Sequence, residues 1–411
     1  MRTVEEHLTH CLEHVRPLSP IELQLLEAQG GLLAEPVVAG RDIPMYDAAT
    51  VDGYAVRAAD VASASSRAPV RLPVIGDVAS GAYGVPYVPP GASARICVDE
   101  PLPTGADAVV PGAETDVGVV AVRVRRPVAA GAHLLTRGME ATAGQVMLDA
   151  GTRIEPSHIG LLAALGREQV LVRPRPRVVV LSVGPDLVEP GQPLSIGQRV
   201  DAGSYLLTTA VRASGAIAYR VGIVPDDPRR LADTIEDQLI RADLVLVTAG
   251  RHEQSQTLVR EVLSRLGKVA FVRVAMRPGA VQGFGVIGPD STPIFALSDD
   301  AFGIAVSFEI FVRPVIRVML GADPVHRPAV DAVLKADIRS DPGLRDFVCA
   351  RLGVEEGRYV VTPIVDNDGG PPAGHSLARL ASSDALVAVP EASTWLGAGD
   401  PAAVMVLERR R

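Results

Sequence analysis

The chain has 411 residues, which is too long for one hydrophobic core, so we expect two to four domains. Its 47% hydrophobic and 21% charged residues are typical of a soluble globular protein, and a net charge of −8 argues against a general nucleic-acid surface. Three widely spaced cysteines and the lack of a long apolar run or signal-peptide pattern predict a cytoplasmic protein with no membrane span.

The N-terminal part contains two helical patterns. Thr3–Val15 begins with a possible capping pair, Thr3 with Glu6, and carries apolar residues on one face. Ile21–Leu33 is predicted as a second helix. Next, Asp52 precedes Gly53 at the entrance to an apolar strand, a turn that can present a carboxylate or simply cap the turn.

Residues 61 to 146 contain short apolar runs separated by Gly and Pro. This pattern predicts a small β domain inserted into the surrounding chain. Ile154–Ala164 follows as a helix, because proline is tolerated in a first helical turn.

The central stretch, residues 177 to 321, alternates buried strands with helices. The two apolar runs at 177–182 and 243–248 are each closed by a glycine and have the character of strands buried on both faces of a parallel sheet. The predicted strands are Arg177–Ser182, Ala218–Val224, Asp243–Thr248, Val269–Ala275 and Pro293–Leu297. The predicted helices are Ser204–Ala213, Pro228–Ala242, Gln256–Leu266 and Ala301–Leu320, the last bent at Pro314. Ligands of such sheets bind beyond the carboxyl ends of the strands, which here means the loops after Ser182, Val224 and Thr248. Short strands after Pro324 predict a separate C-terminal β domain.

Six motifs follow one another along the chain: DGYAVR at 52–57, PLPTGADAVV at 101–110, GTRIEPSHIGLLAALG at 151–166, DLVEPGQPLSIGQ at 186–198, DDP at 226–228 and SFEIFVRPVIRVMLG at 307–321. Together they resemble the molybdopterin molybdenumtransferase family, which comprises MoeA and the E domain of gephyrin. The resemblance implies an α/β plus β fold with a central doubly wound α/β domain, an inserted β domain and a C-terminal β domain. The implied boundaries are 1–60 with 147–175, 61–146, 176–322 and 323–411.

The resemblance also implies a function and a set of site residues. Family members are homodimers that insert molybdenum from molybdate into adenylylated molybdopterin, using Mg²⁺. The implied catalytic residues are Asp52, Asp186, Asp226 and Asp227. The implied substrate-binding residues are Ser182, Gly184, Thr248, Gly250 and Arg277, and the implied metal ligands are Asp52 and Glu140. Ordinary turn and cap duty is the alternative for these carboxylates, and helix capping alone can explain Asp226 and Asp227.

The chain departs from the family pattern in the loops that should hold the ligand. Thr248–Gln254 replaces a glycine-rich loop, Leu297–Gly303 introduces two carboxylates, and the segment after Arg277 lacks one cation. Bulkier and more acidic side chains obstruct a backbone cradle for an anionic ligand. The sequence therefore predicts a family member whose transferase activity is weak or lost.

Two alternatives remain open at this point. One is a non-catalytic gephyrin-like dimer that binds a C-terminal peptide of the tubulin-like division protein FtsZ, which the segment Val272–Gly285 favours by resemblance. The other is a protein that binds or stores molybdopterin without turnover.

Overall fold

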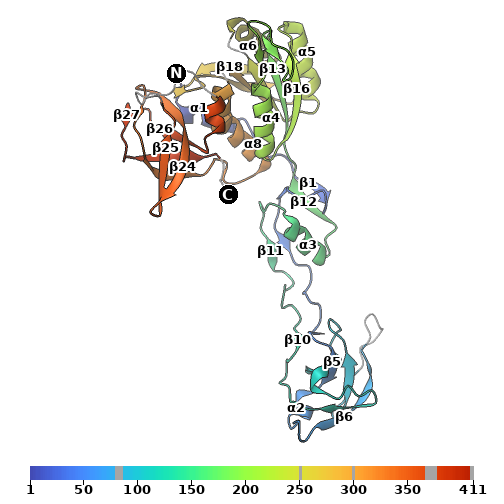
Figure 1. The fold of residues 1–411 in the computed structure, drawn as a ribbon. Coiled ribbons are helices and arrows are strands. Elements are labelled where there is room, and N and C mark those ends of the chain that lie inside the picture. Colours follow the sequence, from blue (N-terminus) through green and yellow to red (C-terminus); the bar gives the residue numbers. More distant parts are fainter. Residues whose placement is uncertain (79–86, 250–251, 299–300, 366–376, 408–411) are drawn as a thin grey trace. The chain divides into compact units, whose positions relative to one another are not determined.

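The computed structural model describes residues 1–78, 87–249, 252–298, 301–365 and 377–407. The chain forms two compact units, one of residues 1–21 and 172–411 and the other of residues 22–171, and each is described by itself (Figure 1). No helix among these residues has the length and apolar character needed to cross a membrane.

The first unit is built on a six-stranded sheet with the order β16-β13-β17-β21-β20-β18. Its strands are β13 (Arg177–Val183), β16 (Ile217–Val224), β17 (Leu244–Ala249), β18 (Gly267–Arg273), β20 (Val281–Ile287) and β21 (Thr292–Ser298). The first four in spatial order are parallel, whereas β20 and β18 are antiparallel additions at one edge. The predicted strands are confirmed, and β20 was not anticipated. Residues 178–181 of β13 are fully buried, as expected for a strand covered on both faces.

Helices connect and cover these strands as the alternating pattern predicts (Figure 1). They are α4 (Gly203–Ala213), α5 (Pro228–Leu239) and α6 (Glu253–Leu266). Leu231 and Ile235 of α5 and Val262 and Leu263 of α6 share one core cluster with β13 and β17. The N-terminal helix α1 (Val4–Glu13) also belongs to this unit, and its predicted capping box between Thr3 and Glu6 is confirmed.

The long helix predicted for Ala301–Leu320 is interrupted earlier than expected. It consists of α7 (Ala301–Ser307), a π-helical segment η2 (Phe308–Val312) and α8 (Arg313–Leu320). Pro314 lies in the first turn of α8, where its missing N–H is tolerated. The irregularity in hydrogen bonding therefore lies in the π-helical turn just before the proline, and the bend at Pro314 stays a prediction.

The predicted C-terminal β domain is confirmed as a closed sheet (Figure 1). Its order is β19-β24-β25-β22-β28-β26, and an additional pairing of β24 with β26 closes it. The strands are β19 (Met276–Arg277), β22 (Ala329–Leu334), β24 (Arg345–Glu355), β25 (Arg358–Pro363), β26 (Ala385–Val389) and β28 (Pro401–Val406), beside β23 (Ile338–Arg339), β27 (Trp395–Leu396) and α9 (Leu377–Ala381). Strand β19 comes from the central stretch of the chain, so its loop is fixed to the barrel.

In the second unit, the predicted helix Ile21–Leu33 is wrong. This stretch forms β1 (Ile21–Gln24), a turn and β2 (Leu32–Leu33), which flank β12 (Gln169–Arg173) in a three-stranded sheet. Leu26, in the middle of the expected helix, is 83% exposed. Pairing with a strand more than a hundred residues later overrides the local helical pattern.

The rest of the second unit is rich in β structure, as predicted. A five-stranded sheet has the order β8-β5-β7-β6-β9, formed by β5 (Gly53–Val56), β6 (Val70–Asp77), β7 (Ser93–Ile96), β8 (Ala108–Pro111) and β9 (Ala121–Val124). The smaller elements are α2 (Ala58–Val61), α3 (Pro156–Ala164), η1 (Gly112–Glu114), β3 (Val37–Val38), β4 (Ala48–Ala49), β10 (Leu134–Leu135) and β11 (Val146–Leu148). The division into four domains with the boundaries given above stays a prediction.

Candidate functional site

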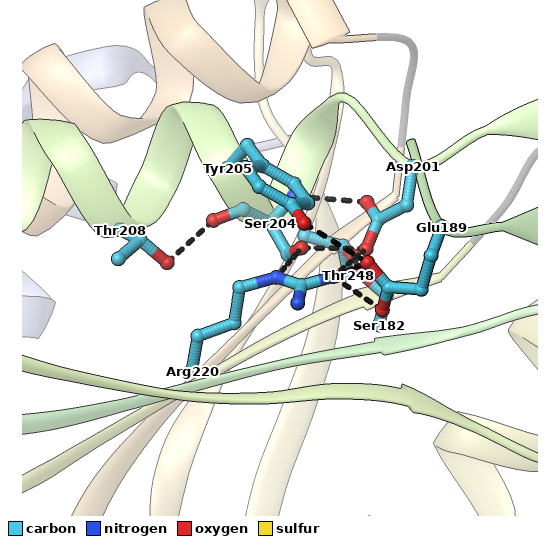
Figure 2. Close-up of polar contacts among 8 residues, drawn as sticks. All are labelled: Ser182, Glu189, Asp201, Ser204, Tyr205, Thr208, Arg220 and Thr248. Carbon is cyan, nitrogen blue, oxygen red and sulfur yellow. Dashed lines mark hydrogen bonds and ion pairs between the residues drawn. The ribbon is translucent and has the colours of Figure 1, made fainter. Parts of the chain in front are cut away.

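Two hydroxyl side chains meet at the carboxyl ends of the central parallel strands. Ser182 of β13 and Thr248 of β17 are partners in the ladder, and their side-chain oxygens lie 2.8 Å apart. Both residues are buried, with 0% and 4% exposure (Figure 2). The structure thus brings together two predicted substrate-binding residues at the edge where α/β sheets bind ligands.

The loop after β13 places Gly184 and Asp186 at the same edge. A Cβ atom on Gly184 would lie 3.0 Å from Oδ1 of Asp186, so the carboxylate packs closely against the backbone. Oδ2 of Asp186 accepts a 2.7 Å hydrogen bond from Nε of Arg199 and lies 3.5 Å from Nε2 of His252. Oδ1 is buried and has no hydrogen-bond partner in the described part of the chain. One carboxylate oxygen is therefore committed to an internal ion pair.

A third group of polar side chains surrounds the N-terminus of α4 (Figure 2). Asp201 is 2% exposed and accepts the backbone N–H of Ser204 at 3.0 Å. Arg220 of β16 donates through Nε to Oγ of Ser204 at 2.7 Å and through Nη2 to both oxygens of Glu189 at 2.7 and 2.8 Å. The same Nη2 lies 3.2 Å from Oδ2 of Asp201. Burial lowers the pKa of Arg220, but its hydrogen bonds to Glu189 and Asp201 outweigh this, and the net shift is upward.

These α4 residues were missed by the sequence analysis. Asp201 and Ser204 stand three residues apart at the start of a predicted helix, which is a capping signature that could have identified Asp201. Arg220 is a lone charge inside the apolar run of β16 and could have been singled out for that reason. The hydrogen-bond partners of Arg220 could not have been identified from the sequence, because they lie 16 to 31 residues away in the chain.

The loop after β16 holds the two adjacent acidic residues. Asp227 is the N-cap of α5 and accepts the backbone N–H of Arg230 at 2.8 Å. This contact fits the capping alternative. Asp226 is half-buried, and its Oδ1 has no hydrogen-bond partner among the described residues. Asp226 therefore has a buried oxygen left to bind a ligand.

Arg277 lies on a loop that is tied to the C-terminal barrel. Its Nε donates to Oδ1 of Asp346 at 2.7 Å, its Nη2 contacts the other oxygen of that carboxylate, and its Nη1 pairs with Asp341. Asp346 is 1% exposed and also accepts from Oγ of Ser340 at 2.6 Å. Burial lowers the pKa of Arg277, and the contacts with Asp346 and Asp341 raise it to a net upward shift. The predicted substrate-binding cation is therefore neutralised within the chain.

The remaining predicted residues lie in the second unit or outside the described ranges. Asp52 is exposed, and its Oδ1 accepts the backbone N–H of Val98 at 2.8 Å. Gly53 is required beside it, because a Cβ there would lie 2.0 Å from the carbonyl oxygen of Val110. Glu140 is exposed. Gly250, and the loop changes at Arg251, Asp299 and Asp300, lie outside the described residues.

The part of the chain that the structure describes contains no set of side chains that matches the expected Mg²⁺. Within the described ranges, no group of three or more His, Cys, Asp or Glu side chains could hold a metal ion. Asp186, at the sheet edge, is instead paired with Arg199. No chemical step can therefore be derived through a bound metal here.

Three family descriptions match successive parts of the chain. They are "MoeA N-terminal region (domain I and II)" over residues 2–166, "Probable molybdopterin binding domain" over 179–318 and "MoeA C-terminal region (domain IV)" over 331–407. A solved structure of a molybdopterin biosynthesis MoeA protein from Pyrococcus horikosii has a TM-score of 0.84 at 27% identity, covering 99% of both chains. The protein thus has the multi-domain MoeA architecture, with mixed α/β sheets and a C-terminal β barrel.

Proteins of similar sequence identify the family within this class. "Molybdopterin molybdenumtransferase 1" of Mycobacterium tuberculosis is 39% identical over 97% of this chain and 97% of its own length. "Molybdopterin molybdenumtransferase 2" of the same organism is 36% identical over 97% and 98%, and the Bacillus subtilis molybdopterin molybdenumtransferase is 29% identical over 91% and 87%. The chain belongs to the molybdopterin molybdenumtransferase family, whose work is molybdenum cofactor biosynthesis, as the resemblance predicted.

Proposed function

We propose that this protein binds a molybdopterin-type ligand at the Ser182–Thr248 edge of its central sheet and transfers molybdenum weakly or not at all. The framework and the two buried hydroxyls support ligand binding at this edge. The internal pairing of the charged groups that surround the ligand supports the loss of transfer. Catalysis depends on positioned groups, and misplacing them costs on the order of a hundredfold in rate.

The observation that carries the proposal is the capture of Arg277 by Asp346. The Arg277 guanidinium already makes two hydrogen bonds to a buried carboxylate, so it has to break this ion pair before it can bind an anionic ligand. Asp186 is similarly held by Arg199. The charged side chains of Arg277 and Asp186, both predicted for the site, are therefore already paired within the chain.

The direct test uses the full-length protein with adenylylated molybdopterin and molybdate, with and without Mg²⁺. Ligand binding is followed by calorimetry and AMP release by chromatography, beside Molybdopterin molybdenumtransferase 1 of M. tuberculosis. We expect saturable ligand binding and AMP release far below that of the relative. Equal rates would contradict the loss of transfer, and absent binding would contradict the ligand site. Complementation of a strain lacking the transferase gives the same answer in cells.

The alternative is a non-catalytic homodimeric scaffold that binds the C-terminal peptide of FtsZ. The same internal pairing supports it, because a scaffold needs the fold and not the reactive charges. Peptide binding that is unchanged by Asp52→Asn, with no molybdopterin binding, would favour the scaffold over the ligand-binding protein. Molar mass from light scattering tests the dimer.

A further inference from the structure

We propose that the guanidinium of Arg220 is a built-in cation, which occupies the position between Glu189 and Asp201 that a divalent metal ion would otherwise take. Arg220 is in this sense a positioning residue: it holds the N-terminus of α4 and the preceding loop together. The inference concerns the same sheet edge as the proposed ligand site. Its readouts, cation binding and thermal stability, are independent of molybdopterin.

The geometry places one guanidinium among oxygen atoms from separate chain segments (Figure 2). Glu189 follows β14 (Leu187–Val188), Asp201 follows β15 (Arg199–Val200), and Ser204 lies in the first turn of α4. Nη2 of Arg220 lies 2.7 and 2.8 Å from the Glu189 oxygens and 3.2 Å from Oδ2 of Asp201. Its Nε lies 2.7 Å from Oγ of Ser204. One side chain therefore joins all three segments.

The set of acceptors is one that a hard cation would use. Two carboxylates and a hydroxyl are oxygen ligands of the kind that Mg²⁺ and Mn²⁺ prefer. Asp201 is 2% exposed, so its charge needs a counter-charge inside the protein. A planar guanidinium supplies this charge and several directed donors at once.

One face of the planar Arg220 guanidinium is covered by an aromatic ring. Cζ of Arg220 lies 4.2 Å from the centroid of the Tyr205 ring, and the Tyr205 hydroxyl donates to Oε2 of Glu189 at 3.1 Å. The Tyr205 ring covers the guanidinium of Arg220, and the Tyr205 hydroxyl donates to Glu189, which also accepts from Arg220. A metal ion that entered this cluster would meet a fixed positive charge and oxygens that already accept hydrogen bonds.

The experiment replaces the built-in cation in the full-length protein by Arg220→Ala. The buried Asp201 loses its counter-charge, so we expect the unfolding temperature to fall by about 5 °C or more. Millimolar MnCl₂ or methylguanidinium should restore at least half of this loss, and the electron paramagnetic resonance of free Mn²⁺ should report bound metal. The wild type should show neither effect.

Arg177→Ala is the matched control. Arg177 pairs with Asp243 at 3.0 Å in the same sheet, and its side chain is 46% exposed. We expect a smaller loss of stability that neither cation restores. Arg220→Lys keeps a positive charge but lacks the several directed donors of a guanidinium. Its stability should lie between those of the wild type and Arg220→Ala, and it should bind no Mn²⁺.

Three results would overturn the inference. The first is Mn²⁺ binding by the wild type that Glu189→Gln abolishes. The second is Arg220→Ala stability equal to that of Arg177→Ala. The third is an Arg220→Ala protein that neither cation stabilises. The wild-type titration decides the question even where the alanine variant does not fold.

Discussion

Replacement of Asp346 by asparagine should destabilise the first unit by about 3 kcal/mol. The asparagine keeps the shape of the side chain and a partner for Ser340, so the change removes mainly the charge opposite Arg277. Two unit charges about 4 Å apart interact with about 4 kcal/mol at an effective dielectric constant of about 20. Arg277 is 27% exposed, which screens part of this, whereas Asp346 is 2% exposed at its side chain. Breaking a buried pair costs about 3–5 kcal/mol, so the lower end applies.

Urea unfolding followed by tryptophan fluorescence measures this loss, because the single tryptophan, Trp395, lies in β27 and pairs with Arg339 of β23, beside the C-terminal barrel. The matched control is Asp341→Asn, which removes the other partner of the same arginine. Its carboxylate is 62% exposed, so we expect a loss below about 1 kcal/mol. Equal losses in the two variants would refute the claim that Asp346 holds Arg277 in place. An Arg277→Met/Asp346→Asn double variant should lose less than the sum of the two single variants.

Three further changes test other parts of the fold. Gly279→Ala should cost about 3 kcal/mol in urea unfolding, because φ is +81° and the new Cβ would lie 2.5 Å from Oγ of Ser307. Gly343→Ala has φ +79° but open space around it, so about 1 kcal/mol is expected, and equal costs would contradict the packing argument. Thr3→Ala removes the cap of α1 and should cost about 1 kcal/mol in the same assay, whereas no loss would show that the cap is dispensable. Burial, with Arg2 and His10 nearby, lowers the pKa of His7 to about 4, so its neutral form is favoured in the fold. Stability should fall as pH drops from 6.5 towards 4, and the wild type should lose about 2–3 kcal/mol more than His7→Gln between pH 7.5 and 4.5; parallel losses would contradict this.

Much of the central fold could be predicted because its signals are local. The apolar runs at 178–181 and 244–247 are buried strands, because no polar residue within them demands solvent. The same local reasoning offered the capping role of Asp227, since an acidic residue before Pro228 satisfies the first free N–H groups of a helix. These inferences need only neighbouring residues.

The failures share a dependence on distant partners. Residues 21–24 and 32–33 are strands because β12, far along the chain, offers main-chain hydrogen bonds that a local pattern does not reveal. The charge state of the site is equally non-local. Arg277 and Asp346 are 69 residues apart in sequence, and nothing near Arg277 indicates that its charge is already used. The electrostatics of the predicted site could therefore not be inferred from the sequence.

The internal ion pairs set a quantitative limit on ligand binding. A ligand that recruits Arg277 has to replace its contact with Asp346, and a loss of about 3 kcal/mol corresponds to more than a hundredfold in dissociation constant. Asp186, with one oxygen held by Arg199, imposes a similar requirement on any ligand that needs both oxygens. The free-energy cost of binding a ligand through Ser182 and Thr248 is smaller, because exchanging one neutral hydrogen bond for another costs about 1 kcal/mol or less. A ligand should therefore be held here mainly by neutral hydrogen bonds and shape, so that its affinity depends less on salt concentration than charge-mediated binding would.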